Sequence, residues 1–265
     1  MKKFCEHAAV LIFWLLVWAG ISAAVGSELL VPSPVSVVLK IAELCQTKSF
    51  WLGVATSLLR VTKGFLLGSV LGVLTAVLTA KSHLASMLLR PILSVIKATP
   101  VASFIILAVI WLSLDKVPVL TSMLVVIPAV WANTEKGILS TDEHLLAMAR
   151  CFSVPKSKIL SGIYLPAVRP YFLAAVNSAM GMAWKAGVAA EVICPYKSSV
   201  GTALHDSKIY LETTELFAWT AVTVLLSVLL EKAVQRLILK ATASQLKYPP
   251  MRLYHCHLIQ HRLPQ

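Results

Sequence analysis

The stretch TDEHLLAMARCFSVPKSKILSGIYLP, residues 141–166, interrupts an otherwise apolar chain with two short amphipathic helical patterns. It opens with hydroxyl and acidic residues, namely Ser140, Thr141, Asp142 and Glu143. Such residues suit a helix N-terminus, because they cap free amides and oppose the helix dipole. Apolar residues then share one helical face, namely Leu145, Leu146, Ala149 and Phe152. After Ser153 and Pro155, a second short helix is predicted to end at Leu165-Pro166, so the stretch is expected to be a helix-turn-helix between membrane spans.

Composition places this stretch in an integral membrane protein. The chain has 265 residues, of which 58% are hydrophobic and 14% charged, and its mean hydropathy is +0.79. A formal net charge of +12 could suggest nucleic acid, but the basic residues are dispersed between apolar runs, so no nucleic-acid partner is expected. The five cysteines lie far apart without a CxxC pair, which argues against a disulfide framework and a metal site.

Apolar runs long enough to cross a bilayer predict an all-α, polytopic fold with about six transmembrane helices. The predicted spans are residues 8–26, 56–80, 92–114, 117–135, 168–190 and 215–238. A short amphipathic helix is expected at 35–46, and a polar stretch from Glu191 to Glu212 separates the last two spans.

Lysine and arginine are more numerous on one side of these spans, which predicts a cytoplasmic N-terminus and C-terminus. Residues 1–248 then form a single transmembrane domain, with the loop 140–166 in the cytoplasm. Residues 249–265 form a basic, flexible cytoplasmic tail, although His255, Cys256, His257 and His261 in it could instead bind a metal. Lys2 and Lys3 before an apolar run that ends in small residues also allow a cleaved secretory signal.

Small residues recur every fourth position along the second predicted span, at Gly64, Gly68, Gly72, Ala76 and Ala80. A face of small residues lets another helix approach closely. It is interpreted either as tight packing within the chain or as the surface of a moving bundle or subunit interface.

The spacing of the loop resembles the permease subunits of binding-protein-dependent ABC importers. Their pattern is Glu-Ala-Ala, three residues, Gly, nine residues, then Ile-x-Leu-Pro. Ala149, Ile163, Leu165 and Pro166 match it. Ala147, Met148 and Ser153 depart from it, and Ser153 is expected to cap the next helix where the family has a turn glycine.

Further stretches resemble the nitrate, sulfonate and taurine branch of that family, in the family's order. They are VPSP at 31–34, SLLRVTKGFLLGSVLG at 57–72, RPILSVIKATPVASFIILAVIWL at 90–112, LPAVRPYF at 165–172 and AWKAGVAAEV at 183–192. Ser113 departs from the glycine that this branch usually has there. The resemblance covers roughly residues 1 to 245.

The resemblance implies a transport subunit of the bacterial inner membrane and not an enzyme. Its implied partners are cytoplasmic ATPase subunits, a second permease copy in a homodimer, an extracytoplasmic solute-binding protein and the lipid bilayer. The chain has no G-x-x-x-x-G-K-[ST] phosphate loop, so ATP and magnesium would be bound by the ATPase, and no cofactor is expected in this chain.

In such importers the ATPase grips the loop, so the resemblance assigns ATPase coupling to residues of 145–166. These are Leu145, Leu146, Ala147, Met148, Ala149, Arg150, Phe152, Ser153, Ile163, Leu165 and Pro166. Met148 and Phe152 suit a partner's apolar pocket. The alternative is an amphipathic helix resting on lipid headgroups. By the same resemblance, the region from Glu191 to Glu215 is the outer docking surface.

Charged residues inside or beside spans are the candidates for the substrate pathway. Lys185 lies deep in the fifth span beside Trp184, and Lys97 lies near the inner end of the third. They would favour a small anion such as nitrate, a sulfonate or taurine. Lys185 could instead pair with Glu191, Lys97 could snorkel to the interface, and Arg60 could attract an anion or anchor the span.

Two other classes stay open. An ion-coupled secondary transporter would need buried coupling sites, for which Glu191 at a span edge is weak support. A membrane-embedded enzyme would need a nucleophile, paired carboxylates or metal ligands at membrane depth. All histidines lie outside the predicted spans or at their edges, and no HExxH or GxSxG occurs.

Overall fold

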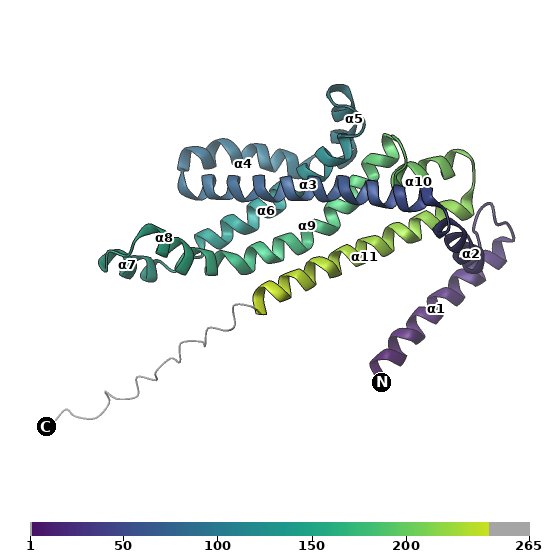
Figure 1. The fold of residues 1–265 in the computed structure, drawn as a ribbon, viewed down its shortest axis with the longest axis horizontal. Coiled ribbons are helices and arrows are strands. Elements are labelled where there is room, and N and C mark those ends of the chain that lie inside the picture. Colours follow the sequence, from purple (N-terminus) through teal and green to yellow (C-terminus); the bar gives the residue numbers. More distant parts are fainter. Residues whose placement is uncertain (1, 244–265) are drawn as a thin grey trace.

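The computed structural model describes residues 2–243, and this part of the chain is helical without strands. Figure 1 shows the long helices side by side. The helices are α1 (Lys2–Val25), α2 (Pro34–Cys45), α3 (Lys48–Lys81), α4 (His83–Ala98), α5 (Val101–Trp111), α6 (Val117–Leu139), α7 (Glu143–Cys151), α8 (Lys156–Ile159), a π-helical turn η1 (Leu160–Tyr164), α9 (Leu165–Ile193), α10 (Val200–Ile209) and α11 (Thr213–Ala243). The predicted tail, with its histidines and Cys256, lies outside the described residues.

Three helices, α3, α6 and α9, form the centre of the fold. The stripe of small residues on α3 faces α6: a Cβ on Gly68 would lie 2.8 Å from the carbonyl oxygen of Met123, and one on Gly72 would lie 2.8 Å from the Cβ of Val130. Ala76, in the same stripe, is fully buried. The structure therefore uses this face for packing within the chain.

Where the central helices cross, α9 approaches closely as well. A Cβ on Gly187 would lie 2.6 Å from the Oγ of Ser122 on α6. The Ser122 hydroxyl donates to the carbonyl of Ala183 at 3.0 Å, so a buried polar group of one helix is satisfied by the backbone of another. Trp184 is 1% exposed and its Nε1 donates to the carbonyl of Thr223, which attaches α11 to the same core.

Four long apolar helices can cross a membrane by length and composition: Lys48–Lys81, Val117–Leu139, Lys156–Ile193 and Thr213–Leu239. They contain the predicted spans 56–80, 117–135, 168–190 and 215–238. A shorter apolar helix, Ile12–Val25, corresponds to the predicted span 8–26. Trp18 in it stacks on Phe217 of α11 with ring centroids 6.0 Å apart.

The predicted third span at 92–114 is bent in the structure. The structure has two helices there, α4 and α5, which meet at an angle of 106°. The break lies at Thr99 and Pro100, both with extended ψ angles, because proline lacks an N–H and pushes the preceding residue out of the helical region. With this pair taken as one span, the described residues contain up to five long spans, where about six were expected.

The sequence predicted that the second helix of the loop ends at Leu165-Pro166. This prediction is wrong. The chain continues as one helix from Lys156 to Ile193. The N–H of Leu165 bonds to the carbonyl of Leu160, five residues back, which makes a π-turn directly before Pro166. The wider turn accommodates the proline ring, which would clash with the Gly162 carbonyl in an ordinary α-helix.

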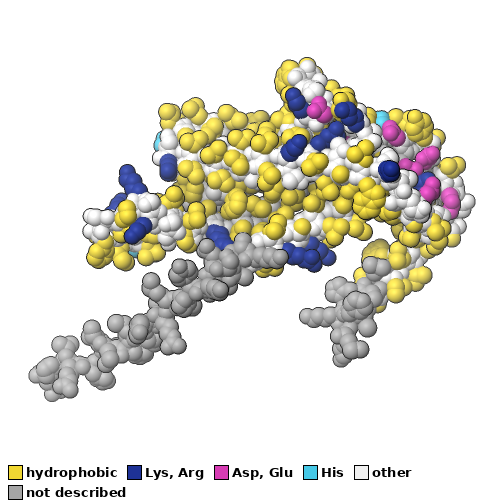
Figure 2. Space-filling model, viewed as in Figure 1, with side chains coloured by type: hydrophobic (Ala, Val, Ile, Leu, Met, Phe, Trp, Pro, Cys, Tyr) yellow, Lys and Arg dark blue, Asp and Glu magenta, His cyan; other side chains and the backbone are white. Residues whose placement is uncertain are grey.

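The two ends of the molecule differ. One end carries α7 and α8 and is called here the loop end; the other carries α2 and α10 and is called the α10 end. Acidic side chains gather at the α10 end in Figure 2, where Lys40 of α2 forms ion pairs with Glu43 at 3.3 Å and with Glu215 of α11 at 3.4 Å. The predicted amphipathic helix at 35–46 is confirmed as α2, with Ser33 as its N-cap.

Candidate functional site

At the loop end, α7 begins as its sequence predicts. The N-cap is Asp142, whose carboxylate accepts a hydrogen bond from the N–H of His144 at 2.8 Å. Arg150 in the last turn has its Nε 3.3 Å from the carbonyl of Leu146, so a cation lies near the negative end of the helix dipole. The acidic start and basic end both stabilise this short helix.

The predicted apolar face of α7 is divided in two. Ala149 is 8% exposed and Leu146 is half-buried, so these two residues face the rest of the protein. Leu145, Met148 and Phe152 point outward, with exposed fractions of 47%, 53% and 77%. Large apolar side chains on a polar, exposed helix are characteristic of a surface that binds a protein or a membrane. We call these three residues the exposed apolar face of α7.

Ser153 lies in the left-handed region, with φ of +50°. The N–H of Ser153 bonds to the carbonyl of Arg150, and the N–H of Val154 bonds to that of Ala149 at 2.9 Å. This pair of bonds is the Schellman motif, whose left-handed position is usually glycine. The expectation that Ser153 caps the next helix is wrong, since the residue before α8 is Pro155 and no side chain caps it.

The other residues assigned to ATPase coupling also lie at the loop end. Ala147 is exposed on α7, Ile163 lies in the π-turn, and Leu165 and Pro166 form the first turn of α9. The helix-turn-helix therefore has one free helix, α7, and one that continues into a span.

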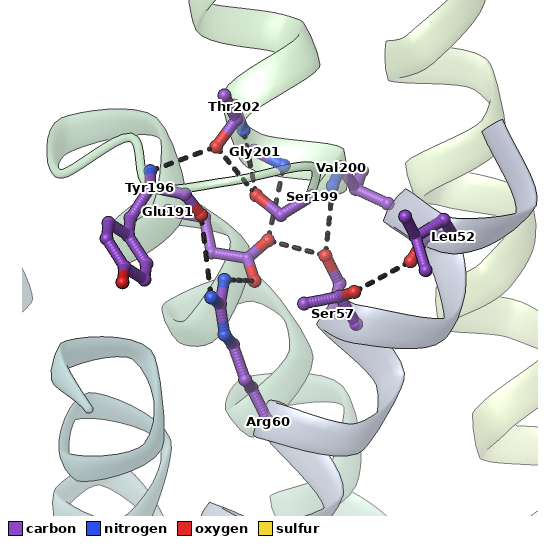
Figure 3. Close-up of polar contacts among 10 residues, drawn as sticks. Leu52, Ser57, Arg60, Glu191, Tyr196, Ser199, Val200, Gly201 and Thr202 are labelled. Carbon is purple, nitrogen blue, oxygen red and sulfur yellow. Dashed lines mark hydrogen bonds and ion pairs between the residues drawn. The ribbon is translucent and has the colours of Figure 1, made fainter. Parts of the chain in front are cut away.

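At the α10 end, Glu191 lies at the centre of a buried polar cluster (Figure 3). It is 1% exposed, and its carboxylate accepts hydrogen bonds from the Ser57 hydroxyl at 2.6 Å and from Nη1 of Arg60 at 3.2 Å. The N–H of Gly201, at the start of α10, adds a third at 3.2 Å. The Ser57 oxygen in turn accepts from the N–H of Val200 at 2.9 Å.

This cluster joins three helices. The carboxylate of Glu191 on α9 faces the N-terminus of α10, where it accepts from the free amide of Gly201 and opposes the helix dipole. Arg60 on α3 supplies the opposite charge and keeps its side chain only 12% exposed. A Cβ on Gly201 would collide with the Cβ of Glu191, so only glycine lets α10 approach this closely.

Comparison with protein families decides what such a chain is. The model of the family described as the binding-protein-dependent transport system inner membrane component matches residues 68–243. The chain belongs to this family. It is a permease subunit of an ABC transporter and not an enzyme, and the ATPase of such systems is a separate partner.

Curated relatives place the permease within the predicted branch. It is 28% identical over 219 residues to a Bacillus subtilis protein named as an aliphatic sulfonates transport permease, with 82% of this chain and 78% of that protein covered. It is 28% identical to a nitrate import permease of Synechococcus elongatus, covering 73% of each. It is 24% identical to a taurine transport system permease of Escherichia coli, covering 86% and 85%.

A solved structure confirms the fold. A chain from the crystal structure of an amino acid ABC transporter with histidines superposes with a TM-score of 0.60, at 15% identity, and the match covers 78% of this chain and 96% of that one. This similarity concerns the architecture alone.

The candidate pathway residues do not form one site. Arg60 and Glu191 pair with each other, so Glu191 is not the partner of Lys185. Trp184 points into the core towards α11 and forms no wall beside Lys185. Lys185 is exposed, about 12 Å along α9 from its end at Ile193.

Lys97 lies deeper than its sequence position suggested. Because α4 begins at His83, the exposed Lys97 lies about 21 Å along it from the loop end, next to the break at Pro100. Neither Lys97 nor Lys185 forms an ion pair with any acidic side chain among residues 2–243. Within the same residues, no three His, Cys, Asp or Glu side chains gather as they would around a metal ion.

The sequence analysis did not find two features: the full Glu191 cluster and the exposed side of α9 around Lys185. Ser57 and Gly201 belong to the Glu191 cluster, and no local signal marks a contact between residues 134 positions apart. The exposed side of α9 around Lys185 could have been found from its spacing, since Ala174, Ser178, Met182 and Lys185 recur every three or four residues.

Proposed function

We propose that this permease, paired with a second copy of itself, forms the translocation pathway through which an ATP-driven importer carries a small anion across the bacterial inner membrane. The observation that carries the proposal is the exposed apolar face of α7, on a helix outside the spans in a chain of this family. ATP and magnesium are bound by the partner ATPase, and an extracytoplasmic binding protein delivers the anion.

The second copy is supported by the exposed lysines. An ammonium group at membrane depth in contact with lipid costs about 2.5 to 3.5 kcal/mol on insertion scales, so such groups face the interior of an assembly or a water-filled cavity. In the single chain Lys185 is exposed on a side of α9 with the small or polar residues Ala174 and Ser178. A second copy facing this side would enclose a polar pathway.

The anionic substrate is supported by the sign of these charges. Lys185 and Lys97 are unpaired with acidic side chains in the described residues, and cations at the wall of a narrow pathway attract anions and repel cations. The relatives named for sulfonates, nitrate and taurine fit this reasoning.

The ATPase would bind at the loop end, which makes that end cytoplasmic, together with the N-terminus and C-terminus. Leu145, Met148 and Phe152 are spaced so that one groove on the ATPase could take all three. The α10 end would face the binding protein. A face that rested on lipid would instead be expected to carry lysines beside the apolar residues, whereas α7 carries Glu143 and has Arg150 turned to its own backbone.

The test is uptake by proteoliposomes containing the permease, its ATPase and its binding protein. Met148→Asp should abolish ATP-driven uptake or prevent the ATPase from co-purifying, while the thermal stability of the permease stays within about 0.5 kcal/mol, because the side chain is exposed. Met148→Leu should preserve uptake. Full uptake by Met148→Asp would contradict the assignment of α7, and uptake driven by an ion gradient without ATP would favour a secondary transporter.

A second measurement addresses the pathway. Lys185→Gln should lower anion uptake by about tenfold or more, since it removes the charge and keeps the length of the side chain, whereas Lys185→Arg should retain most of it. Basal ATP hydrolysis should be the same in both variants. Equal uptake by all three proteins would show that Lys185 does not face the anion.

A further inference from the structure

A groove of about 470 Å³ opens at the loop end, between the last turns of α3 and α6 and the helix that runs from α8 through the π-turn into α9. Its walls are apolar, with Val73 and Val77 on α3, Ile138 on α6 and Leu165 on α9. Lys81 on α3 and Lys156 on α8 also line it. The groove thus combines an apolar interior with two cations from different helices.

Thr134 of α6 also lines the groove, and its hydroxyl has no hydrogen-bond partner although the residue is only 2% exposed. Several other threonines in the spans donate to a carbonyl three or four residues earlier, as Thr121 does to Val117 at 2.8 Å and Thr79 does to Ala76 at 3.2 Å. Buried polar groups left without a partner are rare and costly. Thr134 therefore has an unused donor beside the groove.

The two lysines are available to an anion. Both are exposed, and neither is in an ion pair with a carboxylate anywhere in residues 2–243. The residues that line the groove include no aspartate or glutamate. Lysine side chains at the end of a membrane span lay their alkyl stems along apolar surface and place the ammonium at the headgroup level.

We propose that this groove binds one anionic phospholipid of the cytoplasmic leaflet. An acyl chain lies along the apolar wall, the phosphate lies between Lys81 and Lys156, and the Thr134 hydroxyl donates to an ester or phosphate oxygen. Basic pockets between membrane helices on the cytoplasmic side suit anionic headgroups. The choice of leaflet rests on the proposed function, which makes the loop end cytoplasmic.

The position of the groove gives the lipid a mechanical role. One wall is the π-turn region, where Ile159, Leu160 and Tyr164 also line the groove. A lipid bound here contacts α3, α6 and the start of α9 at once, so it stabilises one arrangement of α8 relative to the central helices. The occupancy of the groove then affects how readily the loop moves.

The test uses the full-length chain with its co-purifying subunits, placed in nanodiscs of phosphatidylethanolamine with increasing phosphatidylglycerol. Native mass spectrometry counts the phosphatidylglycerol molecules that each complex retains, without ATP present. Lys81→Gln/Lys156→Gln should weaken retention roughly thirtyfold, or about fivefold for each lysine. Thr134→Val, which keeps the side-chain shape, should weaken it about threefold to tenfold.

The matched control is Lys136→Gln/Lys158→Gln, which removes the same charge from exposed residues of α6 and α8 that do not line the groove. It should retain phosphatidylglycerol as the unmodified protein does. Equal loss in the control, equal retention of phosphatidylethanolamine, or displacement by millimolar inorganic phosphate would overturn the proposal. So would a rise in lipid binding when the ATPase is removed, because the ATPase would then be the occupant.

Failure of the lipid site and failure of the proposed function give different results. Retained phosphatidylglycerol with no ATP-driven uptake would leave the lipid site standing and refute the importer. Normal ATP-driven uptake, together with unchanged lipid retention in every groove variant, would leave the importer standing and refute the lipid site.

Discussion

The two ends of the permease differ in the groups that distinguish them: paired polar side chains at the α10 end and exposed apolar side chains on α7 at the loop end. At the α10 end, Glu191 has three hydrogen-bond donors, one of which, Arg60, is also its counter-charge, and Lys40 lies between two carboxylates. At the loop end, three large apolar side chains are exposed and Ser153 is held in a left-handed conformation. Large apolar side chains, such as Tyr210 and Leu211, are exposed at the α10 end too, so the two ends differ in the paired polar cluster, which the first has and α7 lacks.

This difference separates the residues that hold the subunit rigid from the residues that are free to bind a partner. Buried, fully paired polar groups hold α3, α9 and α10 in one arrangement. Exposed apolar groups contribute little to the stability of the chain alone and gain their free energy on association. Substitutions at the two ends should therefore separate stability from partner binding.

The largest effect should come from Glu191→Ala. Removing the carboxylate leaves the charge of Arg60 and the N-terminus of α10 without a buried partner, and breaking such a pair costs about 3 to 5 kcal/mol. Thermal unfolding in detergent should show a large loss of stability. Glu43→Ala, at a side chain that is 70% exposed, is the control and should change stability by less than about 1 kcal/mol. Equal effects would mean that the α10 end is not held by the cluster.

Gly68→Leu should have the next largest effect, because it acts on the packing that connects the two ends. Its side chain would meet the Met123 carbonyl at 2.8 Å, and overpacking of this kind costs about 1 to 3 kcal/mol. Folded yield and thermal stability measure it. Gly20→Leu on α1, where nothing lies within 4 Å, should be tolerated. Normal stability of Gly68→Leu would show that α3 and α6 are not closely packed.

A smaller effect, of opposite sign, is expected for Ser153→Gly. Glycine adopts the left-handed region without strain, which should stabilise the turn by about 0.5 to 1 kcal/mol. Amide hydrogen exchange of residues 153–158 should slow by a few fold, and Ser153→Ala should show no such slowing. Unchanged exchange in the glycine variant would mean that the turn is not strained.

The smallest effect concerns Lys40. Partial burial lowers its pKa, and contacts with Glu43 and Glu215 outweigh this and leave the pKa above the ordinary 10.5. A raised pKa means that the pair contributes stability at neutral pH and loses it as the pH rises through that value. Lys40→Gln should cost about 0.2 to 1 kcal/mol at low salt, and less at high salt, in thermal unfolding at pH 7. A larger loss that persists in high salt would contradict this assignment.

The sequence predicted elements whose signal is local. Hydropathy located four long spans because about 20 apolar residues are needed to cross a bilayer, and Asp142 marked the start of α7 through its capping chemistry. The break at Pro100 was missed because apolar residues continue on both sides of it, and hydropathy does not record direction.

Features that depend on distant residues could not be predicted in this way. Glu191 had several possible partners, and its choice of Arg60 follows from how α3 and α9 cross. Trp184 and Lys185 are neighbours in sequence but lie on different faces of α9, one buried in the core and one exposed. Ser153 was expected to cap the next helix in place of a turn glycine, but the bond from the N–H of Val154 to the carbonyl of Ala149 holds it in the left-handed turn.

The unbroken helix from Lys156 to Ile193 also acts as a lever. Its far end is clamped at Glu191, about 52 Å along the axis from Lys156 and about 9 Å from Lys185. If the helix turns as a rigid body about that clamp, displacement at Lys156 is reduced about sixfold at Lys185. Under the proposed function, an ångström-scale movement of the loop would become a fine adjustment of the Lys185 ammonium group beside the anion.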